Sequence, residues 1–274
     1  MHLTSASLSR TALVTALLLG ATAPVASAGI IVDDFSVSAQ SAFTTATTNY
    51  TANLANQNTA WNESIFQLTD AKHQRAISAT WSTRFSENQT LSQAARLARS
   101  AGAVVDTTVG RANLKMDGRI SSGSTGLTYR AAPGGSLDLA GLTSGIRIEG
   151  GLTSLTGFSN PITQGLSLQV LLTDNSGDSS SFTWYGNTTA GGFNGLDGTL
   201  ETIWSNFQAT EPGDDADLSD IAAIDVRLFY SHIGLSSSPT ISASYSMDSI
   251  VLVPAPAAVA LLAVVPFFSR RRRS

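Results

Sequence analysis

No cysteine occurs in the 274-residue sequence, so disulfides, thiolate metal sites and a cysteine nucleophile are excluded. Histidine is scarce as well, with three residues, and no Gly-x-Ser-x-Gly, His-Glu-x-x-His or phosphate-binding glycine loop is present. His73 and His232 stand far apart in the sequence, and we expect both at the surface near strand ends. These absences indicate a protein without enzymatic activity.

Charged residues are also few, at 13% of the chain, and they are unevenly distributed. Five of the 16 basic residues, Arg10 and Arg270–Arg273, lie near the two ends, which leaves 11 basic residues against 20 acidic ones in between. A body with this negative charge is repelled by phosphate backbones, so no nucleic acid is expected as a partner. Glycine, serine and threonine are frequent, as in proteins built from short strands and polar turns.

Residues 1–28 have the three parts of a secretory signal peptide. Arg10 supplies the positive charge, residues 11–20 form a short apolar core, and Ala26 and Ala28 form a small-residue cleavage site. The apolar run is too short for a membrane-spanning helix. We therefore predict an exported protein whose mature form starts near Gly29.

The C-terminal segment, VPAPAAVALLAVVPFFSRRRRS, is predicted to be a second targeting element. A proline-containing start is followed by the apolar run 257–268 and then by Arg270, Arg271, Arg272 and Arg273. This order predicts a membrane-engaging tail with the arginines on the cytoplasmic side. The run is shorter than the ~20 residues of a spanning helix, and a plain tail anchor or a buried terminal helix stays open as an alternative.

This layout resembles the PEP-CTERM sorting signal of bacterial surface proteins, in which a Pro-Glu-Pro-type motif precedes an apolar segment and an arginine-rich end. Val253, Pro254, Ala255 and Pro256 stand at the motif, with Ala255 in place of the family's glutamate. The resemblance implies processing by an exosortase-like enzyme and retention, transient or stable, at the cell envelope or cell surface. It covers residues 253–274 only.

Between these segments, residues 29–252 are predicted to form one all-β domain. Alternating or β-branched runs are separated by turn sequences such as Asp117-Gly118 and Asp197-Gly198. The candidate strands are 74–82, 103–109, 112–116, 126–130, 145–149, 166–172, 181–185, 200–208, 221–230, 240–245 and 249–253. This spacing predicts an antiparallel two-sheet sandwich, jelly-roll-like, flanked by the signal peptide and a C-terminal hydrophobic helix.

Two stretches of the body differ in how clearly they can be interpreted. Leu166 to Tyr185 is the clearest hairpin, because Leu166, Leu168 and Val170 alternate with polar residues before a turn at 174–178. Residues 88–100 fit a helix or a strand, and both interpretations stay open.

The body also resembles the exported β-sandwiches that accompany such tails. In those proteins an opening Asp-Asp-Phe strand, here 33–35, and a closing strand with Asp248, Ile250 and Leu252 frame a galactose-binding-like jelly roll. The resemblance covers about half of the body. It implies the fold more than the function, because one sandwich carries many activities.

Loop aspartates predict a possible structural calcium site and no other cofactor. Calcium takes six to eight oxygen ligands from carboxylates and carbonyls. Asp33 or Asp34 could share an ion with Asp248 if the first and last strands are adjacent, and the aspartates of 174–178 and 214–217 have ligand-like spacing. Turn formation and capping are the alternative for each group.

Aromatic residues near a glycine-rich loop predict possible contacts with extracellular polysaccharide. Sugar sites combine aromatic faces with fixed polar groups. Trp184 and Tyr185 precede the loop 186–198, and Trp204 lies on the next predicted strand. Neighbouring residues of a strand point to opposite faces, so either Trp184 or Tyr185 is expected in the core. Simple core packing of these aromatics is the alternative.

The sequence thus predicts a bacterial cell-surface or extracellular-matrix protein with a structural or adhesive role. A carbohydrate-binding module is the first alternative, and a secreted glycan hydrolase is the second. A glycosidase needs two carboxylates at a defined separation. Asp33, Asp34, Glu149, Glu201 and the acidic run 214–220 are candidates, but none stands in a recognisable glycosidase motif.

Overall fold

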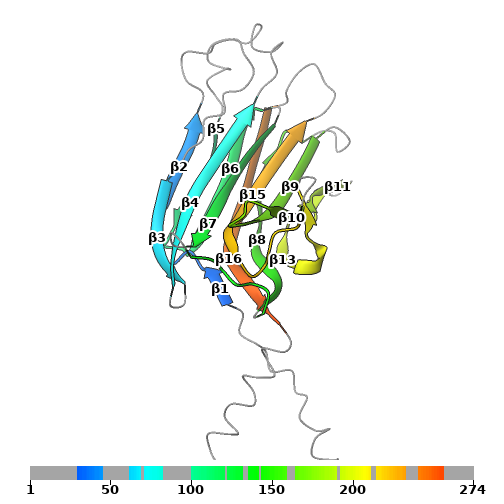
Figure 1. Cartoon of the computed structure of the whole chain (residues 1–274). Helices are drawn as coiled ribbons and strands as arrows, with labels where there is room; N and C mark the ends of the chain where they lie inside the picture. The colour runs from blue at the N-terminus through cyan, green and yellow to red at the C-terminus, as the bar shows by residue number, and fades with distance from the viewer. Residues whose placement is uncertain are drawn as a thin grey trace, which may run out of the picture. The chain divides into compact units, whose positions relative to one another are not determined.

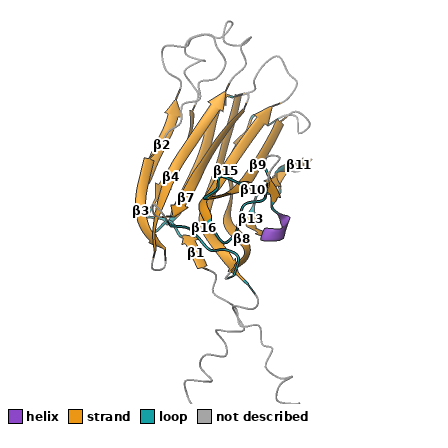
Figure 2. Cartoon of the chain, viewed as in Figure 1, coloured by secondary structure: helices purple, strands orange, loops and turns teal. Residues whose placement is uncertain are grey.

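Two antiparallel sheets, packed face to face, form the body of the protein (Figure 1). The computed structural model describes residues 30–45, 62–68, 71–82, 100–120, 122–131, 135–141, 143–158, 164–189, 192–210, 214–232 and 240–255. All of them belong to one compact unit, Gly29–Ala255. Its elements are strands and a short 3-10 helix, η1 (Trp204–Asn206), as Figure 2 shows. The predicted all-β sandwich is confirmed.

The first sheet, called sheet A, contains both the first and the last described strand. Its order is β13 (Gly198–Ile203), β8 (Thr143–Thr156), β16 (Thr240–Pro254), β6 (Arg111–Arg119), β5 (Ser100–Asp106) and β2 (Gln40–Thr45). β1 (Ile30–Asp33) also pairs with β16, with Ile30 opposite Leu252. The first and last strands are therefore adjacent, which was the condition set for an ion shared by Asp33 or Asp34 with Asp248.

The second sheet, sheet B, faces sheet A across the core. Its order is β14 (Gln208–Ala209), β10 (Ser179–Tyr185), β9 (Gln164–Asp174), β15 (Ile221–His232), β7 (Ser122–Ala131), β4 (Ala71–Ser82) and β3 (Asn62–Leu68). A separate small hairpin pairs β11 (Asn187–Thr189) with β12 (Gly192–Asn194).

Alternation along the central strands of sheet B separates the core from the outer face. Leu166, Leu168 and Val170 of β9 are buried against sheet A, whereas Gln169 between them points outward and is half-buried. Each fully buried aliphatic side chain contributes about 1.5–3 kcal/mol. This burial holds the register of β9, because a slip by one residue would place the leucines on the outer face.

Most of the predicted strands are present, with differences at their ends. The hairpin from Leu166 to Tyr185 is confirmed as β9 and β10. The prediction of one strand over 200–208 is wrong, since β13 ends at Ile203 and η1 intervenes before β14. The two strands predicted at 240–245 and 249–253 are one strand, β16, with a register shift between Met247 and Ser249. Asp248 is the extra residue at this bulge.

Three predicted segments lie outside the described residues: the signal peptide 1–28, the ambiguous stretch 88–99 and the tail from 256 onward. Ser100 begins β5. In the described part of the chain, no helix is long and apolar enough to cross a bilayer.

Candidate functional site

Asp33, the first calcium candidate, points into the core and is held by an arginine. The side chains of Asp33 and Arg75 are 1% and 0% exposed, and Arg75 Nη1 donates to Asp33 Oδ2. Tyr129 donates its hydroxyl to the same oxygen at 3.1 Å, and the backbone N–H of Phe35 donates to Asp33 Oδ1 at 2.8 Å. Both carboxylate oxygens therefore have protein partners.

The remaining donors of Arg75 fasten the segment between β1 and β2 to sheet B. Its Nε donates to Gln40 Oε1 at 2.7 Å, and its Nη2 donates to the carbonyl of Val37 at 3.0 Å and also to that of Ser38. Burial raises the pKa of the Asp33 carboxyl, since loss of water outweighs the attraction of Arg75 and the hydrogen bonds. This cluster is a structural anchor between the sheets.

The other two calcium candidates near β1 lie at the surface with partners of their own. Asp34 Oδ1 accepts the N–H and hydroxyl of Ser36 at 3.0 and 2.6 Å. Asp248 is 2.6 Å from Arg111 Nε in an exposed ion pair. Among the described residues, no three His, Asp or Glu side chains lie close enough together to hold a metal ion. Calcium binding stays a prediction.

Asp174 organises the turn that was considered for calcium. Its Oδ1 accepts the backbone N–H groups of Ser176, Gly177 and Asp178 at 2.9–3.0 Å, and its Oδ2 accepts the N–H of Asp217 at 2.9 Å. The Asp217 amide, the Ser176 hydroxyl at 2.7 Å and the amides of Asp178 and Gly177 hold the pKa of Asp174 below its ordinary value, with the Asp217 amide the largest contributor. The carboxylate thus joins the β9–β10 turn to the loop before β15.

The three aromatic candidates have three different environments. Trp204 is 8% exposed, its Nε1 donates to Thr143 Oγ1 at 3.0 Å, and its ring packs edge-on against Phe207. The prediction that Trp204 contacts sugar is corrected, because η1 turns this ring into the core. Trp184 is half-buried, and its ring centroid lies 5.0 Å from that of Phe182. Tyr185, by contrast, is 70% exposed. The prediction that one of this pair points inward is confirmed.

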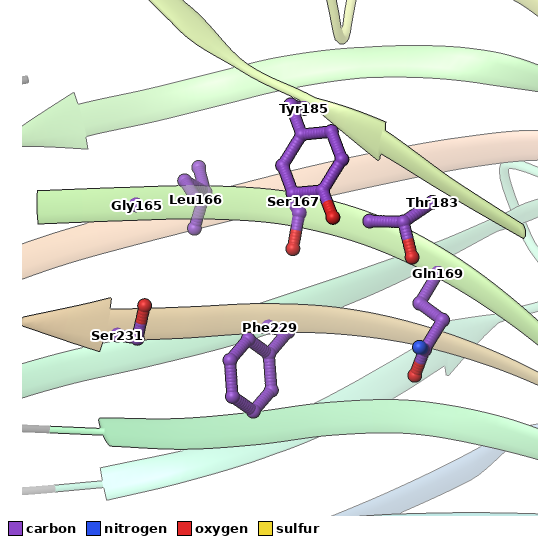
Figure 3. Close-up of a pocket in the computed structure, with 8 residues that line it drawn as sticks. All are labelled: Gly165, Leu166, Ser167, Gln169, Thr183, Tyr185, Phe229 and Ser231. Carbon is purple, nitrogen blue, oxygen red and sulfur yellow. The ribbon is translucent and has the colours of Figure 1, made fainter. Parts of the chain in front are cut away.

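Tyr185 lies on the outer face of sheet B beside a hollow of about 250 Å³ (Figure 3). Its cross-strand partner on β9 is Ser167, and the partner of Ser167 on β15 is Phe229. Phe229 is 42% exposed. Two aromatic rings thus flank one small hydroxyl residue, which leaves a depression between them about two strand spacings, ~9.6 Å, across.

Polar residues surround the two rings. Gln169 and Thr183 lie at one end of this hollow, and Gly165 and Ser231 lie at the other (Figure 3). We call this depression the first hollow. The hydroxyls and the amide of these residues can both donate and accept hydrogen bonds.

A second hollow of about 480 Å³ adjoins the first. The two share Gln169, Thr183 and Tyr185, and the second extends to Asn206, Gln208 and Thr210 at the edge of sheet B. Asn206 Nδ2 donates to Thr202 Oγ1 at 3.2 Å, which orients its amide. Because the hollows share residues, we call them together the sheet B groove.

Sequence reasoning missed Phe229 and Gln169. Leu228 and Tyr230 of β15 are buried, so the alternation of this strand was the signal by which Phe229 could have been assigned to the outer face. The same signal was present in β9 for Gln169. The sequence pattern did not reveal that β15 pairs with β9, and it is this pairing that places Phe229 opposite Ser167.

Other candidate residues lie away from the groove. His232 is 6% exposed, so its predicted surface position is wrong, and the side chain of His73 lies outside the described residues. Glu149 and Glu201 both lie on sheet A and pair with Arg147. Glu149 Oε1 is 3.7 Å from Arg147 Nε, and Glu201 Oε2 is 3.9 Å from Arg147 Nη1.

A scan against protein-family models, a search of curated proteins and a search of solved structures found no match to this chain.

Proposed function

We propose that this protein is an exported, adhesive β-sandwich that binds carbohydrate without cleaving it. The observation that carries the proposal is the row Tyr185, Ser167 and Phe229 above the first hollow. Exposed ring faces cover the apolar C–H surfaces of sugars, and neighbouring amides and hydroxyls satisfy sugar hydroxyls. The rings of Tyr185 and Phe229 are 70% and 42% exposed on an otherwise polar part of the sheet face, where both are accessible to a ligand.

The chemistry of the groove supports binding rather than hydrolysis. Of the described residues that line the two hollows, none is Asp, Glu, Lys, Arg or His. Glycoside hydrolysis needs two carboxylates flanking the scissile bond. We therefore assign the groove no catalytic step.

The strand order supports a jelly roll as the finer description of the fold. In sheet A, β6, β16, β8 and β13 neighbour one another in this order, and in sheet B β7, β15, β9 and β10 do so. Among these eight strands the chain crosses between the sheets at every connection except the β9–β10 hairpin. This is the interleaving of two Greek keys. It agrees with the resemblance to galactose-binding-like sandwiches, with β5 and β2, and β4 and β3, as additional strands at the edges.

The two terminal segments support export and retention at the cell envelope. The features are the signal-peptide pattern 1–28 and the PEP-CTERM-like segment 253–274, for which an exosortase-like enzyme and the membrane are the proposed partners. Mass spectrometry of the C-terminal peptide from the fractionated native host tests this. A mature end near Val253–Ala257 is expected, and intact arginines in the membrane fraction would contradict processing.

Affinity electrophoresis tests the binding function directly. The full chain is run through gels that contain cellulose derivatives, mannan, xylan or β-1,3-glucan, beside the Tyr185→Ala variant. We expect retardation by at least one of these polymers and its loss in the variant. If none retards the protein, or if Tyr185→Ala is retarded equally, the proposed site is wrong.

A further inference from the structure

The sheet B groove is longer than a site for one sugar. The first hollow spans β15, β9 and β10, and the second spans β9, β10 and the segment from Asn206 to Thr210 that contains β14. From β15 to β14 there are three strand steps, about 14 Å. An extended chain of pyranose rings advances by about one strand spacing per sugar, so the groove matches about three to four units.

Small residues lie beside the larger ones at the two ends of the groove. Ser231 of β15 and Gly165 of β9 lie next to Phe229 at one end, and Ala209 and Thr210 lie next to Gln208 at the other. A Cβ atom on Gly165 would lie 3.3 Å from Ser231 Oγ, so glycine at this position leaves the groove open beside Ser231. Small residues at both ends let a polymer continue past the site, which favours recognition of internal units over recognition of a chain end.

The polar groups of the groove are those that recognise uncharged hydroxyls. Gln169, Asn206 and Gln208 supply amides, each with a donor and an acceptor, at spacings along the groove. Beside the groove, Arg227 lies opposite Gln169 in the register, and its Nη2 is 2.7 Å from Asp225 Oδ2. Because Arg227 and Asp225 neutralise each other, this pair adds no net charge beside the groove.

We propose that the sheet B groove binds an uncharged, extended glycan chain that crosses β15, β9, β10 and β14 and occupies both hollows at once. This inference rests on the proposed carbohydrate-binding function. Tyr185 belongs to both hollows and contacts the middle of the chain. Phe229 contacts the sugars at the β15 end, and Asn206 and Gln208 bind those at the β14 end.

Isothermal titration of the full chain with neutral oligosaccharides tests the length of the site. The probes are cello-, manno-, xylo- and laminari-oligosaccharides from the disaccharide to the hexasaccharide. For whichever series binds, we expect the affinity to rise roughly tenfold or more from disaccharide to tetrasaccharide and then to level off. Equal affinity for the disaccharide and the hexasaccharide would overturn the two-hollow arrangement while leaving carbohydrate binding intact.

Variants of each hollow separate the two subsites. Asn206→Ala with Gln208→Ala is expected to weaken hexasaccharide binding roughly tenfold and disaccharide binding far less, whereas Phe229→Ala weakens both. Ile203→Ala is the matched control, because Ile203 is similarly exposed, at 48% against 42% for Phe229, but lies on sheet A. Thermal unfolding of every variant establishes that the protein is folded. An unchanged hexasaccharide affinity in the double variant would overturn the second subsite.

A charged probe tests the selectivity for neutral chains. Oligogalacturonate of the same lengths is expected to bind at least tenfold more weakly than the best neutral series. Equal or tighter binding of oligogalacturonate overturns the assignment of an uncharged ligand. If no neutral or charged oligosaccharide binds the wild-type protein, the proposed function itself fails, which is a different outcome from the loss of length dependence.

Discussion

Tyr185 and Phe229 share one cross-strand neighbour, Ser167, although they lie 44 residues apart in the sequence. The small side chain of Ser167 lets the two rings border a hollow instead of packing on a third large residue. This relationship exists only because β15 and β10 pair with opposite edges of β9. It combines apolar ring faces and hydroxyl groups on one surface, which is the combination on which the proposed sugar site depends.

Removal of Arg75 is predicted to destabilise the protein strongly. Arg75→Met removes the ionic partner of the buried Asp33 carboxylate, and such losses cost about 3–5 kcal/mol in the free energy of unfolding. Urea denaturation measures the effect. Asp33→Asn combined with Arg75→Met should recover part of the loss, because the uncompensated charge is then absent.

The exposed ion pair on sheet A supplies the control for this prediction. Arg111 and Asp248 have side chains that are 54% and 47% exposed. Arg111→Ala is therefore expected to cost about 1 kcal/mol or less. Similar losses for Arg75→Met and Arg111→Ala would show that the buried cluster does not anchor the N-terminal segment.

The sequence predicted the local parts of this fold better than its long-range parts. The β9–β10 hairpin follows from alternation and turn residues that are adjacent in the chain. The partner of Asp33 could not be predicted, because Arg75 reaches it across 42 positions and carries no local pattern. Trp204 was misjudged for a related reason: three residues of 3-10 helix changed the direction of its ring.

Glycine at position 145 is predicted to be required for the pairing of β8 with β13. A Cβ atom there would lie 2.0 Å from the carbonyl oxygen of Thr202, a backbone atom that cannot move without displacing β13. Gly145→Ala is expected to lower the free energy of unfolding by about 1–3 kcal/mol. Gly141→Ala is the control, since nothing lies within 4 Å of its Cβ position, and it should change stability by about 0.5 kcal/mol or less. If denaturant unfolding gives Gly145→Ala and Gly141→Ala the same change in the free energy of unfolding, the contact assigned between position 145 and the Thr202 carbonyl is contradicted.

Trp204 is predicted to contribute to stability and not to ligand binding. Trp204→Phe removes the Nε1–H donor to Thr143 Oγ1 but keeps an apolar ring, so we expect a loss of about 1 kcal/mol. Sugar affinity should stay unchanged. A tenfold loss of sugar affinity in a folded Trp204→Phe protein would contradict this prediction and show that Trp204 contributes to binding.

Acid is predicted to weaken the loop that Asp174 organises. The pKa of Asp174 lies below its ordinary value of 3.8 in the folded protein, mainly because the Asp217 amide donates to it. A carboxyl group with a lowered folded pKa stabilises the fold above its unfolded pKa and loses this contribution as pH falls through 3.8 and then through the folded value.

The urea midpoint of the wild type should therefore fall more steeply between about pH 5 and about pH 2 than that of Asp174→Asn, so that the two curves converge at the acid end. Asp214→Asn, at an exposed loop position, is the matched control for the removal of one carboxylate. Parallel curves for wild type and Asp174→Asn would show that this carboxylate does not stabilise the loop.

Calorimetric titration of the wild type, Tyr185→Ala, Phe229→Ala and the double variant with one neutral polysaccharide tests the central claim most directly. Loss of each ring contact is expected to weaken binding roughly tenfold, about 1.4 kcal/mol, and loss of both to abolish measurable heat. Thermal unfolding midpoints should stay close to that of the wild type, because both rings are exposed. Undiminished affinity in the folded double variant would place the ligand elsewhere and contradict the account.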